Sequence, residues 1–359
     1  MKNALITGIT GQDGAYLTKF LLEKGYKVYG TYRRLSTPNF WRLIYLDIFD
    51  KVELLSADLI DSSSMLQAIE TSNPSEIYHL AAQSFVDASF DQPIGTGEIT
   101  GLGVTKILEG IRHIDPHIRF YQASTSELYG NGSREPQSEI SPFYPSSPYS
   151  AAKIYGYWIT RIYRESYGIF ASNGILFNHE SPLRGMEFVT RKITNSVARI
   201  KLGIDTTLEL GNLKAKRDWG YAPEYVQLMW QILQQDEPDD FVIATGETHS
   251  IEEFVTNAFD VVGLDWQKYV KINHKYFRPV DVNYLQGDCA KAKRTFGWEP
   301  KVKFNELVEL MVLEDVSRWE RWLSGERFAW DATNYPTQST LFLLHKEPLD
   351  YFSRKTILT

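Results

Sequence analysis

The sequence predicts an α/β protein built on a doubly wound parallel sheet, with a smaller second domain made from separate stretches of chain. Three observations predict this fold class. Short apolar runs alternate with amphipathic stretches, a glycine-rich turn follows the first run, and the regular alternation ends after Phe177. Continuous apolar runs are typical of strands buried on both faces, and their alternation with helices indicates parallel crossover connections.

The strand candidates follow one another through the first 245 residues. They are Ala4–Thr7, Val28–Tyr32, Val52–Ser56, Ile77–Ala81, Arg119–Ser124, Ala171–Phe177 and Phe241–Thr245. The clearest amphipathic helices between them are Tyr16–Glu23 and Val104–Ile114. We therefore expect residues 1–177 and 217–250 to form the sheet domain.

The second domain is predicted from two segments with a different rhythm. Residues 178–216 are loop-rich with one helix over roughly 191–202, and residues 251–317 mix helices with proline and glycine punctuation. Residues 318–359 contain several tryptophans without a clear periodicity, and we assign them to a C-terminal extension of unknown role.

Composition excludes several classes of function. The net charge is 38 − 45 = −7 with no long basic run, so we expect no nucleic-acid partner. The single cysteine, Cys289, excludes an internal disulfide, and the seven histidines lack metal-ligand spacing, so we expect no metal. With no signal-peptide pattern and no apolar window approaching about 18 residues, we expect a cytoplasmic protein that does not span a membrane.

A glycine-rich turn lies between the first strand and the first helix. Glycines at this position permit a tight turn and close approach of the backbone to a pyrophosphate, and the helix N-terminus adds N–H donors. This context predicts a Rossmann-type dinucleotide site. The residues expected there are Gly8, Thr10, Gly11, Gln12, Asp13 and Gly14.

The end of the second strand indicates which dinucleotide binds. NAD-binding enzymes usually place a carboxylate about twenty residues past the glycines, whereas this chain has Arg33 and Arg34. An arginine pairs with the 2′-phosphate of NADP, and a carboxylate would repel it. We therefore expect NADP. Asp58 and Leu59 are expected near the adenine. The expected ribose neighbours are Leu80, Ala81, Ala82, Gln83 and Ser84.

Chemistry-bearing residues follow the fifth strand and begin the next helix. The strand ends in Ser124-Thr125-Ser126-Glu127, and Tyr149 and Lys153 stand four residues apart just after Pro148. An ammonium beside a phenol, together with an oxidised nicotinamide, is expected to lower the pKa of Tyr149 so that it acts as a base near neutrality.

This combination resembles the extended branch of the short-chain dehydrogenase/reductase superfamily. Within that branch, the hydroxyl residues and glutamate followed by tyrosine and lysine are similar to the nucleotide-sugar 4,6-dehydratases. Glu127 is the discriminating residue, because a dehydratase must remove the carbon-5 proton and expel the carbon-6 hydroxyl, and a carboxylate can serve both steps.

Longer segments over about residues 1–317 resemble the GDP-mannose 4,6-dehydratase family. They are residues 173–182 with 184–185, 188–193, 211–213, 217–220, 238–246, 278–279 and 287–288. The resemblance implies that His179 and Arg184 contact the cofactor. It also implies that the GDP moiety is held by Asn178, Val189, Lys192, Arg217, Arg278 and Asp281, and the sugar by Ser84, Thr125, Glu127 and Tyr149. It further implies a homo-oligomer, dimer or tetramer, in which Arg33–Leu43 reaches a neighbour's cofactor.

The implied activity is a hydro-lyase reaction on GDP-mannose with internal hydride transfer through NADP. Tyr149, helped by Lys153, deprotonates the 4-hydroxyl, Thr125 stabilises that oxygen, and Glu127 removes the carbon-5 proton with Glu127 or Ser126 assisting departure of water. Related alternatives are an epimerase, a 4-keto reductase, or a bifunctional dehydratase and reductase, acting on mannose or a related hexose or heptose. An alternative of another class is a non-catalytic NADP-sensing module.

Overall fold

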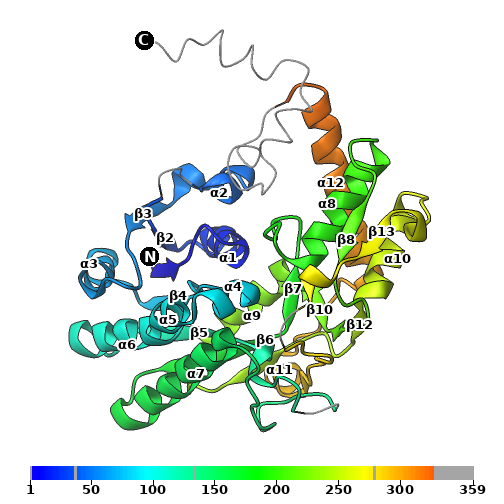
Figure 1. Ribbon diagram of the computed structural model, residues 1–359. Helices are drawn as coiled ribbons and strands as arrows, with labels where there is room; N and C mark the ends of the chain where they lie inside the picture. The colour runs from blue at the N-terminus through cyan, green and yellow to red at the C-terminus, as the bar shows by residue number, and fades with distance from the viewer. Residues whose placement is uncertain (1, 36–38, 133–134, 278–279, 327–359) are drawn as a thin grey trace.

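A computed structural model of the chain describes residues 2–35, 39–132, 135–277 and 280–326 (Figure 1). Among these residues, seven strands form one sheet in the order β11-β6-β5-β4-β1-β2-β3, and every neighbouring pair is parallel. The strands are β1 (Asn3–Thr7), β2 (Lys27–Tyr32), β3 (Glu53–Ser56), β4 (Glu76–His79), β5 (Arg119–Thr125), β6 (Ala171–Leu176) and β11 (Phe241–Ile243). The predicted doubly wound Rossmann-type fold is confirmed.

Two predicted strands end two residues earlier than expected, because side-chain acceptors replace the hydrogen bonds between strands. The fourth was expected to reach Ala81 but ends at His79, and the Ala81 N–H donates to the hydroxyl of Thr7 at 3.2 Å. The last was expected to reach Thr245 but ends at Ile243, and the Thr245 N–H donates to the Asp218 carboxylate at 2.8 Å. Both departures turn the chain away from the sheet at its carboxyl edge.

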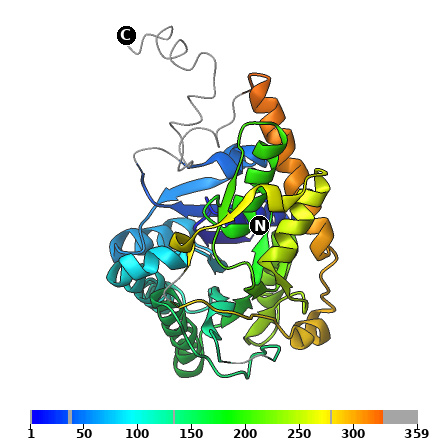
Figure 2. The ribbon, with the colours of Figure 1, turned by 45° about the vertical axis from the view of Figure 1, so that its right-hand side comes forward.

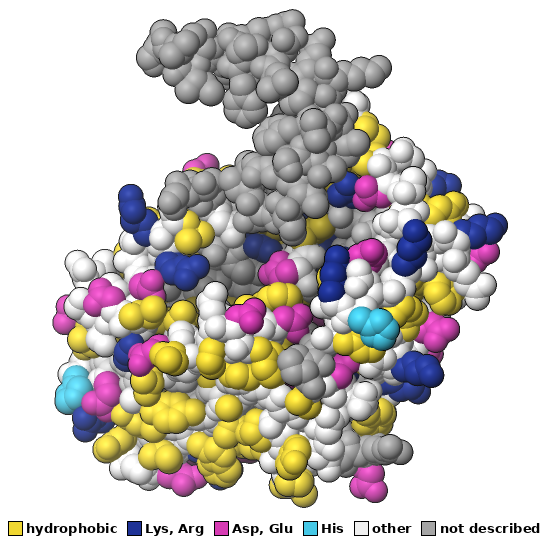
Figure 3. Space-filling view, viewed as in Figure 1, with side chains coloured by type: hydrophobic (Ala, Val, Ile, Leu, Met, Phe, Trp, Pro, Cys, Tyr) yellow, Lys and Arg dark blue, Asp and Glu magenta, His cyan; other side chains and the backbone are white. Residues whose placement is uncertain are grey.

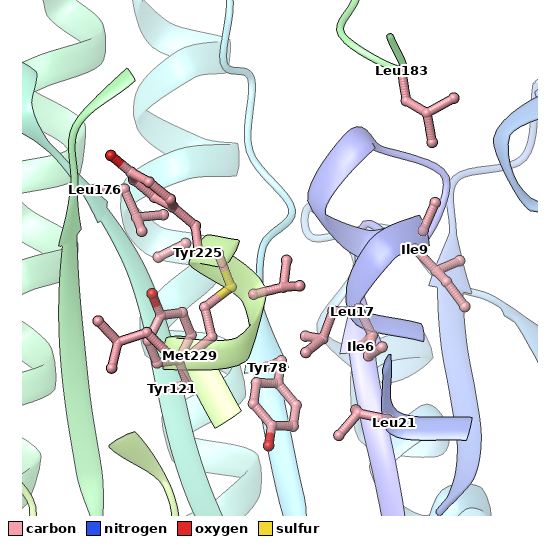
Figure 4. Close-up of a cluster of buried hydrophobic side chains, with 14 of the residues drawn as sticks. Ile6, Ile9, Leu17, Leu21, Tyr78, Tyr121, Leu176, Leu183, Tyr225 and Met229 are labelled. Carbon is pink, nitrogen blue, oxygen red and sulfur yellow. The ribbon is translucent and has the colours of Figure 1, made fainter. Parts of the chain in front are cut away.

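Helices cover both faces of the sheet, as Figures 1 and 2 show. One face packs against α1 (Gln12–Glu23) and α9 (Ala222–Ile232), with α2 (Trp41–Tyr45) and α11 (Ala290–Phe296) at its margins. In Figure 4, Leu17 and Leu21 of α1 and Met229 of α9 lie beside Tyr78 and Tyr121 of the sheet. The other face packs against α3 (Ser62–Ser72), α6 (Gly103–Ile114) and α7 (Pro148–Tyr167). Between β4 and α6 lie α4 (Val86–Asp91), α5 (Pro93–Thr96) and the π-helical segment η2 (Gly97–Leu102).

A second lobe with its own apolar core stands beside the carboxyl edge of the sheet (Figure 2). Its helices are α8 (Val189–Lys201), α10 (Ile251–Val261) and α12 (Phe304–Leu323), and β8 (Leu208–Leu210) pairs in parallel with β13 (Val270–Ile272). Two short pairs join it to the sheet: β7 (Asn178–Glu180) with β10 (Trp219–Tyr221), and β9 (Lys216–Arg217) with β12 (His249–Ser250). Single 3₁₀ turns are η1 (Phe49–Lys51), η3 (Ser126–Leu128), η4 (Trp266–Lys268) and η5 (His274–Tyr276).

The helix α12 crosses the boundary that we predicted at residue 317. It continues to Leu323 and buries Trp319 and Trp322. Residues 318–323, which we assigned to a C-terminal extension, therefore continue a helix of the second lobe. The buried stripe of this helix includes two charged residues, Asp315 and Arg318, and these charges hid its apolar periodicity in the sequence.

Candidate active site

Two pockets meet where β1, β4, β5 and β6 end. The glycine-turn pocket lies over the turn that follows β1, and the lobe pocket lies between the strand ends and the second lobe. Ligand sites of doubly wound folds lie at this carboxyl edge of the sheet. Among the described residues, those lining both pockets, which we call the junction, are Ser84, Thr125, Glu127, Tyr149, Asn178, Arg184, Glu187 and Phe188.

Glycines shape the turn because neighbouring backbone leaves no room for a side chain. Gly8 has a φ of +74°, and a Cβ there would lie 2.9 Å from the Cα of Ala81. A Cβ on Gly14 would lie 2.5 Å from the Gly8 carbonyl oxygen, so α1 packs directly onto the turn. The predicted turn residues Gly8, Thr10, Gly11, Gln12, Asp13 and Gly14 all line the glycine-turn pocket.

Polar side chains connect the glycine turn to the segment after β6. The Asp13 carboxylate lies 2.7 Å from His179 Nε2, and the Gln12 amide donates to the His179 carbonyl oxygen at 3.1 Å. Burial alone would lower the pKa of His179, but the Asp13 carboxylate raises it, and His179 in turn lowers the pKa of Asp13. His179 lines the same pocket as the turn.

Some predicted cofactor neighbours do not reach the pocket surface. Leu80, Ala82 and Ser84 line the glycine-turn pocket, whereas Ala81 packs over Gly8 and Gln83 donates its N–H to Thr100. The residues predicted near the adenine end that line neither pocket are Arg33, Arg34, Asp58 and Leu59. Arg33 and Arg34 are exposed just beyond β2, and Leu59 is buried against Gly103.

The strand β5 and the helix α7 bring the predicted catalytic residues together. Thr125 ends β5, and its hydroxyl accepts the Glu127 N–H at 3.2 Å, which starts η3 and presents Glu127 to both pockets. Ser147 caps α7 in a reciprocal pair with Ser150, so Tyr149 lies in the first turn of that helix. Ser126 and Lys153 line the glycine-turn pocket.

Burial dominates the electrostatics of the Tyr149–Lys153 pair. Burial raises the pKa of Tyr149, although hydrogen bonding with the Thr125 side chain opposes that rise. Burial also lowers the pKa of Lys153 to about 8. The Lys153 ammonium donates to the Ala123 carbonyl oxygen at 2.6 Å and lies 5.9 Å from the Tyr149 ring centroid. The lowering of this pKa by the ammonium together with an oxidised nicotinamide stays a prediction, because it concerns the protein with its cofactor bound.

The lobe pocket collects residues predicted to hold the GDP moiety. Those lining it are Asn178, Val189, Lys192, Arg217 and Asp281, and Arg278 lies outside the described residues. The Lys192 ammonium lies 3.5 Å from the centroid of the Tyr276 ring, and burial lowers the pKa of Lys192. Asn212 donates to the Asp281 carboxylate at 2.9 Å. Arg217 is buried and provides a further cationic side chain at this pocket, beside Lys192 and Arg184.

Sequence reasoning missed several pocket residues. Arg42 lines the glycine-turn pocket of its own chain, and its guanidinium donates to the backbone oxygens of Thr10 and Leu183 at 3.0 and 2.7 Å. Glu187 is a second carboxylate at the junction. A lone arginine in a helix and a lone glutamate in a loop carry no spacing signal, so only their positions in the fold reveal them.

None of the helices in the described ranges is long and apolar enough to cross a membrane. No group of three or more metal-ligating side chains converges within those ranges.

Comparisons with known proteins agree with this geometry. The family model described as "GDP-mannose 4,6 dehydratase" matches residues 5–311. The chain is 51% identical over 330 residues to "GDP-mannose 4,6 dehydratase 2" of Arabidopsis thaliana, covering 89% of this chain and 88% of that protein. It is 50% identical over 338 residues to the human "GDP-mannose 4,6 dehydratase", covering 87% and 91% of the two chains.

Solved structures share the fold at low identity. A dTDP-glucose 4,6-dehydratase from Bacillus anthracis, in complex with NAD, superposes with a TM-score of 0.78 at 20% identity over 90% of this chain and 99% of that one. A UDP-glucose 4-epimerase from Thermotoga maritima gives 0.78 at 24% identity over 89% and 99%. These likenesses concern the fold, whereas the family follows from the sequence matches. This chain therefore belongs to the GDP-mannose 4,6-dehydratase family of enzymes.

Proposed function

We propose that the protein is a hydro-lyase that converts GDP-mannose to GDP-4-keto-6-deoxymannose, with NADP as a cofactor that is regenerated in each turnover. The observation that carries this proposal is the junction, where Thr125, Glu127 and Tyr149 line both pockets. A sugar held there would face a hydroxyl, a carboxylate and a phenol at once. Reversible oxidation needs only the hydroxyl and the phenol, whereas elimination of water also needs the carboxylate.

When bound, a nicotinamide ring supplies reversible two-electron oxidation, which the reaction uses at sugar carbon 4 and, in the opposite direction, at carbon 6. Tyr149 takes the proton of the 4-hydroxyl, and the Thr125 hydroxyl donates to the same oxygen. Since burial raises the pKa of Tyr149, the phenolate needs nearby positive charge. Lys153, four residues along α7, is the nearest cationic side chain on the same helix.

Glu127 performs the elimination. The 4-ketone acidifies carbon 5, and the Glu127 carboxylate removes that proton. The carbon-6 hydroxyl then leaves as water, with its proton delivered by Glu127, so that one molecule of water is lost for each sugar. Ser126 is the alternative donor that we expected, but it lines only the glycine-turn pocket, so the structure favours Glu127 for this step. Having passed its first proton to the departing water, Glu127 takes up a solvent proton and donates it to carbon 5, while Tyr149 releases the 4-hydroxyl proton, so the protons balance.

The glycine turn fits a dinucleotide. The absence of side chains at Gly8, Gly11 and Gly14 leaves the backbone of the turn open to a ligand. The first residues of α1, from Gln12, line the same pocket, and the N-terminus of a helix offers free N–H donors to a pyrophosphate. NADP rather than NAD is supported by Arg33 and Arg34, which follow β2 where NAD-binding enzymes usually have a carboxylate. Binding of NADP⁺ and NAD⁺ to the wild type and to the variants Arg33→Ala and Arg34→Ala tests this choice; equal affinities in the wild type would exclude it.

The experiment that tests the function is incubation with GDP-mannose and NADP⁺ in deuterated water, followed by NMR. We expect loss of the carbon-6 hydroxyl, a new methyl group and deuterium at carbon 5. Glu127→Gln should still allow oxidation at carbon 4 but stop the loss of water, whereas Glu187→Gln should have the smaller effect. If Glu187→Gln instead abolishes elimination, Glu187 is the base. Lasting oxidation of added NADPH would indicate a reductase.

We also propose that the enzyme is a homo-oligomer, in line with the family resemblance. Apolar side chains gather over α5, α6 and α7 (Figure 3). Tyr155, Trp158 and Ile162 share one face of α7 and are between 40% and 47% exposed, and Leu102 of η2 is exposed to a similar degree. Exposed apolar patches of this kind mark interaction sites. Sedimentation of the wild type and of Trp158→Glu tests the proposal; a wild-type monomer would exclude it.

A further inference from the structure

Three consecutive backbone carbonyls beside the junction are held by three arginines from separate elements. The Pro182 oxygen accepts from Arg191 Nη1 of α8 at 2.7 Å and from Arg318 Nη1 of α12 at 2.6 Å. The Leu183 oxygen accepts from Arg42 Nε of α2 at 2.7 Å, and the Arg184 oxygen accepts from Arg191 Nη1 at 3.1 Å. We call this set, Arg42, Arg191 and Arg318, the arginine clamp.

Two members of the clamp are held in place by a buried carboxylate. Asp315 of α12 lies 2.5 Å from Arg191 and 3.7 Å from Arg318, and it also accepts from the Thr194 hydroxyl at 2.7 Å. Arg191, Arg318 and Asp315 are each at most 2% exposed. Buried charges persist only when they are paired and hydrogen-bonded, so these guanidiniums have little freedom to move.

The third member ties the same carbonyls to the glycine turn. Arg42 Nη1 donates to the Thr10 oxygen at 3.0 Å while its Nε donates to Leu183. The Leu183 side chain is fully buried and points toward Ile9 of the turn (Figure 4). Ser181 adds a second link, because its hydroxyl donates to the Gln12 side chain at 2.7 Å.

The clamped segment delivers side chains to both pockets. Arg184 ends this segment, Glu187 and Phe188 follow it, and all three belong to the junction. The Arg184 guanidinium lies 3.7 Å from the centroid of the Phe188 ring. α8, which carries Lys192 of the lobe pocket, begins at Val189. Movement of this segment would therefore change both pockets together.

We propose that Arg42, Arg191 and Arg318 are positioning residues that join the glycine turn to the second lobe through the carbonyls of 182–184, and so couple occupancy of the glycine-turn pocket to GDP binding in the lobe pocket. This inference rests on the proposed function, since it takes the two ligands to be a nicotinamide dinucleotide and a nucleoside diphosphate. Coupling of this kind is a difference in affinity that each ligand imposes on the other.

The test measures binding without turnover, using GDP and NADP⁺ as probes. We expect saturating NADP⁺ to tighten GDP binding to the wild type by about fivefold or more, and the factor to fall below about twofold in Arg42→Met. GDP affinity in the absence of NADP⁺ should be nearly unchanged, because Arg42 does not line the lobe pocket. Arg42→Lys, which keeps the charge but cannot reach both oxygens with one nitrogen, should restore only part of the coupling.

Arg119 offers a matched control. Its guanidinium also donates to two backbone oxygens, those of Leu233 and Gln235, and lies over the Phe170 ring at 4.3 Å, as Arg42 lies over Trp41 at 4.4 Å. Arg119 lines neither pocket. Arg119→Met should lower thermal stability as Arg42→Met does while leaving the coupling factor at its wild-type value.

The outcomes separate this inference from the proposed function. If wild-type protein binds neither GDP nor NADP⁺, the proposed function fails and the inference falls with it. If both ligands bind but show no coupling, or if Arg42→Met and Arg42→Lys keep the wild-type coupling factor, the clamp does not link the pockets and the inference alone is overturned.

Discussion

The two pockets are built by different means. The glycine-turn pocket is lined by residues that follow parallel strands, so the sheet ladder and the turn glycines set its shape. The lobe pocket is lined by loops and helices from distant stretches of chain, and buried charges such as Asp315 and Arg191 hold its elements in place. Catalytic residues that the sheet positions should therefore keep their geometry when the lobe is disturbed. Ligand binding in the lobe pocket should instead depend on a few polar side chains.

The largest effect is expected at the sheet-built part of the junction. Tyr149→Phe keeps the buried ring but removes the proton acceptor, so turnover should fall by about 10³-fold with little change in GDP affinity. Steady-state kinetics and GDP titration measure the two quantities. Tyr167→Phe, at the exposed end of the same helix, is the matched control and should be active. A Tyr149→Phe variant with near wild-type turnover would falsify the role of this phenol.

The next effect concerns the charges that hold the lobe. Asp315→Ala leaves the buried Arg191 and Arg318 without their shared carboxylate, and the free energy of unfolding should fall by about 3–4 kcal/mol. Denaturant unfolding measures the loss. Glu23→Ala breaks an exposed pair whose atoms are 3.8 Å apart and should cost less than about 1 kcal/mol. Equal losses of unfolding free energy in the two variants would show that buried charges do not hold the lobe in place.

A smaller effect is expected in the glycine turn. A Cβ on Gly14 would meet backbone atoms of Gly8 and Ile9 at 2.5 and 2.7 Å, so α1 must shift, at a cost of about 1–3 kcal/mol. Gly14→Ala should therefore weaken NADP⁺ binding roughly tenfold or more while GDP binding without NADP⁺ stays close to the wild-type value. Gly95→Ala is the control, because a Cβ there meets nothing within 4 Å. Unchanged NADP⁺ affinity in Gly14→Ala would contradict the packing argument.

The smallest expected effect is a dependence of stability on pH. Burial lowers the pKa of Lys153 to about 8 from an unfolded value near 10.5. The unfolded chain therefore holds a proton that the folded protein lacks between these pH values. The resulting penalty on the fold is fully present below pH 8 and is relieved as the pH rises toward 10.5. Lys153→Met should stabilise the protein by about 1–2 kcal/mol at pH 7, and this gain should shrink as the pH rises from about 8 to 10.5.

Unfolding at several pH values measures the difference between Lys153→Met and the wild type. The exposed Lys271→Met is the control and should change stability by less than about 0.5 kcal/mol at every pH. A gain from Lys153→Met that does not vary with pH would show that burial of the charge is not its cause.

The fold and the core of the site could be predicted because their signals are local. A buried strand followed by glycines and a helix can be recognised within about fifteen residues of sequence, as at Gly8–Gly14. The spacing of Tyr149 and Lys153 by itself places them on one face of a helix. The end of α12 could not be predicted, since Asp315 and Arg318 interrupt its apolar stripe. Their burial depends on partners elsewhere in the chain, such as Arg191 of α8 and the Pro182 carbonyl oxygen. The rise that burial causes in the pKa of Tyr149 could not be predicted either, because this burial depends on residues from several elements.

The sequence by itself determined the parallel sheet, the glycine turn and the residue types that carry the chemistry, because short-range periodicity and backbone sterics dictate them. Only the tertiary structure decided that Glu127 belongs to both pockets, that Arg42 bridges the turn and the 182–184 segment, and that Arg33 and Arg34 stand exposed beyond β2. The physical reason is distance along the chain. Contacts between residues a hundred or more positions apart are fixed by how the lobes pack, and no local pattern encodes them.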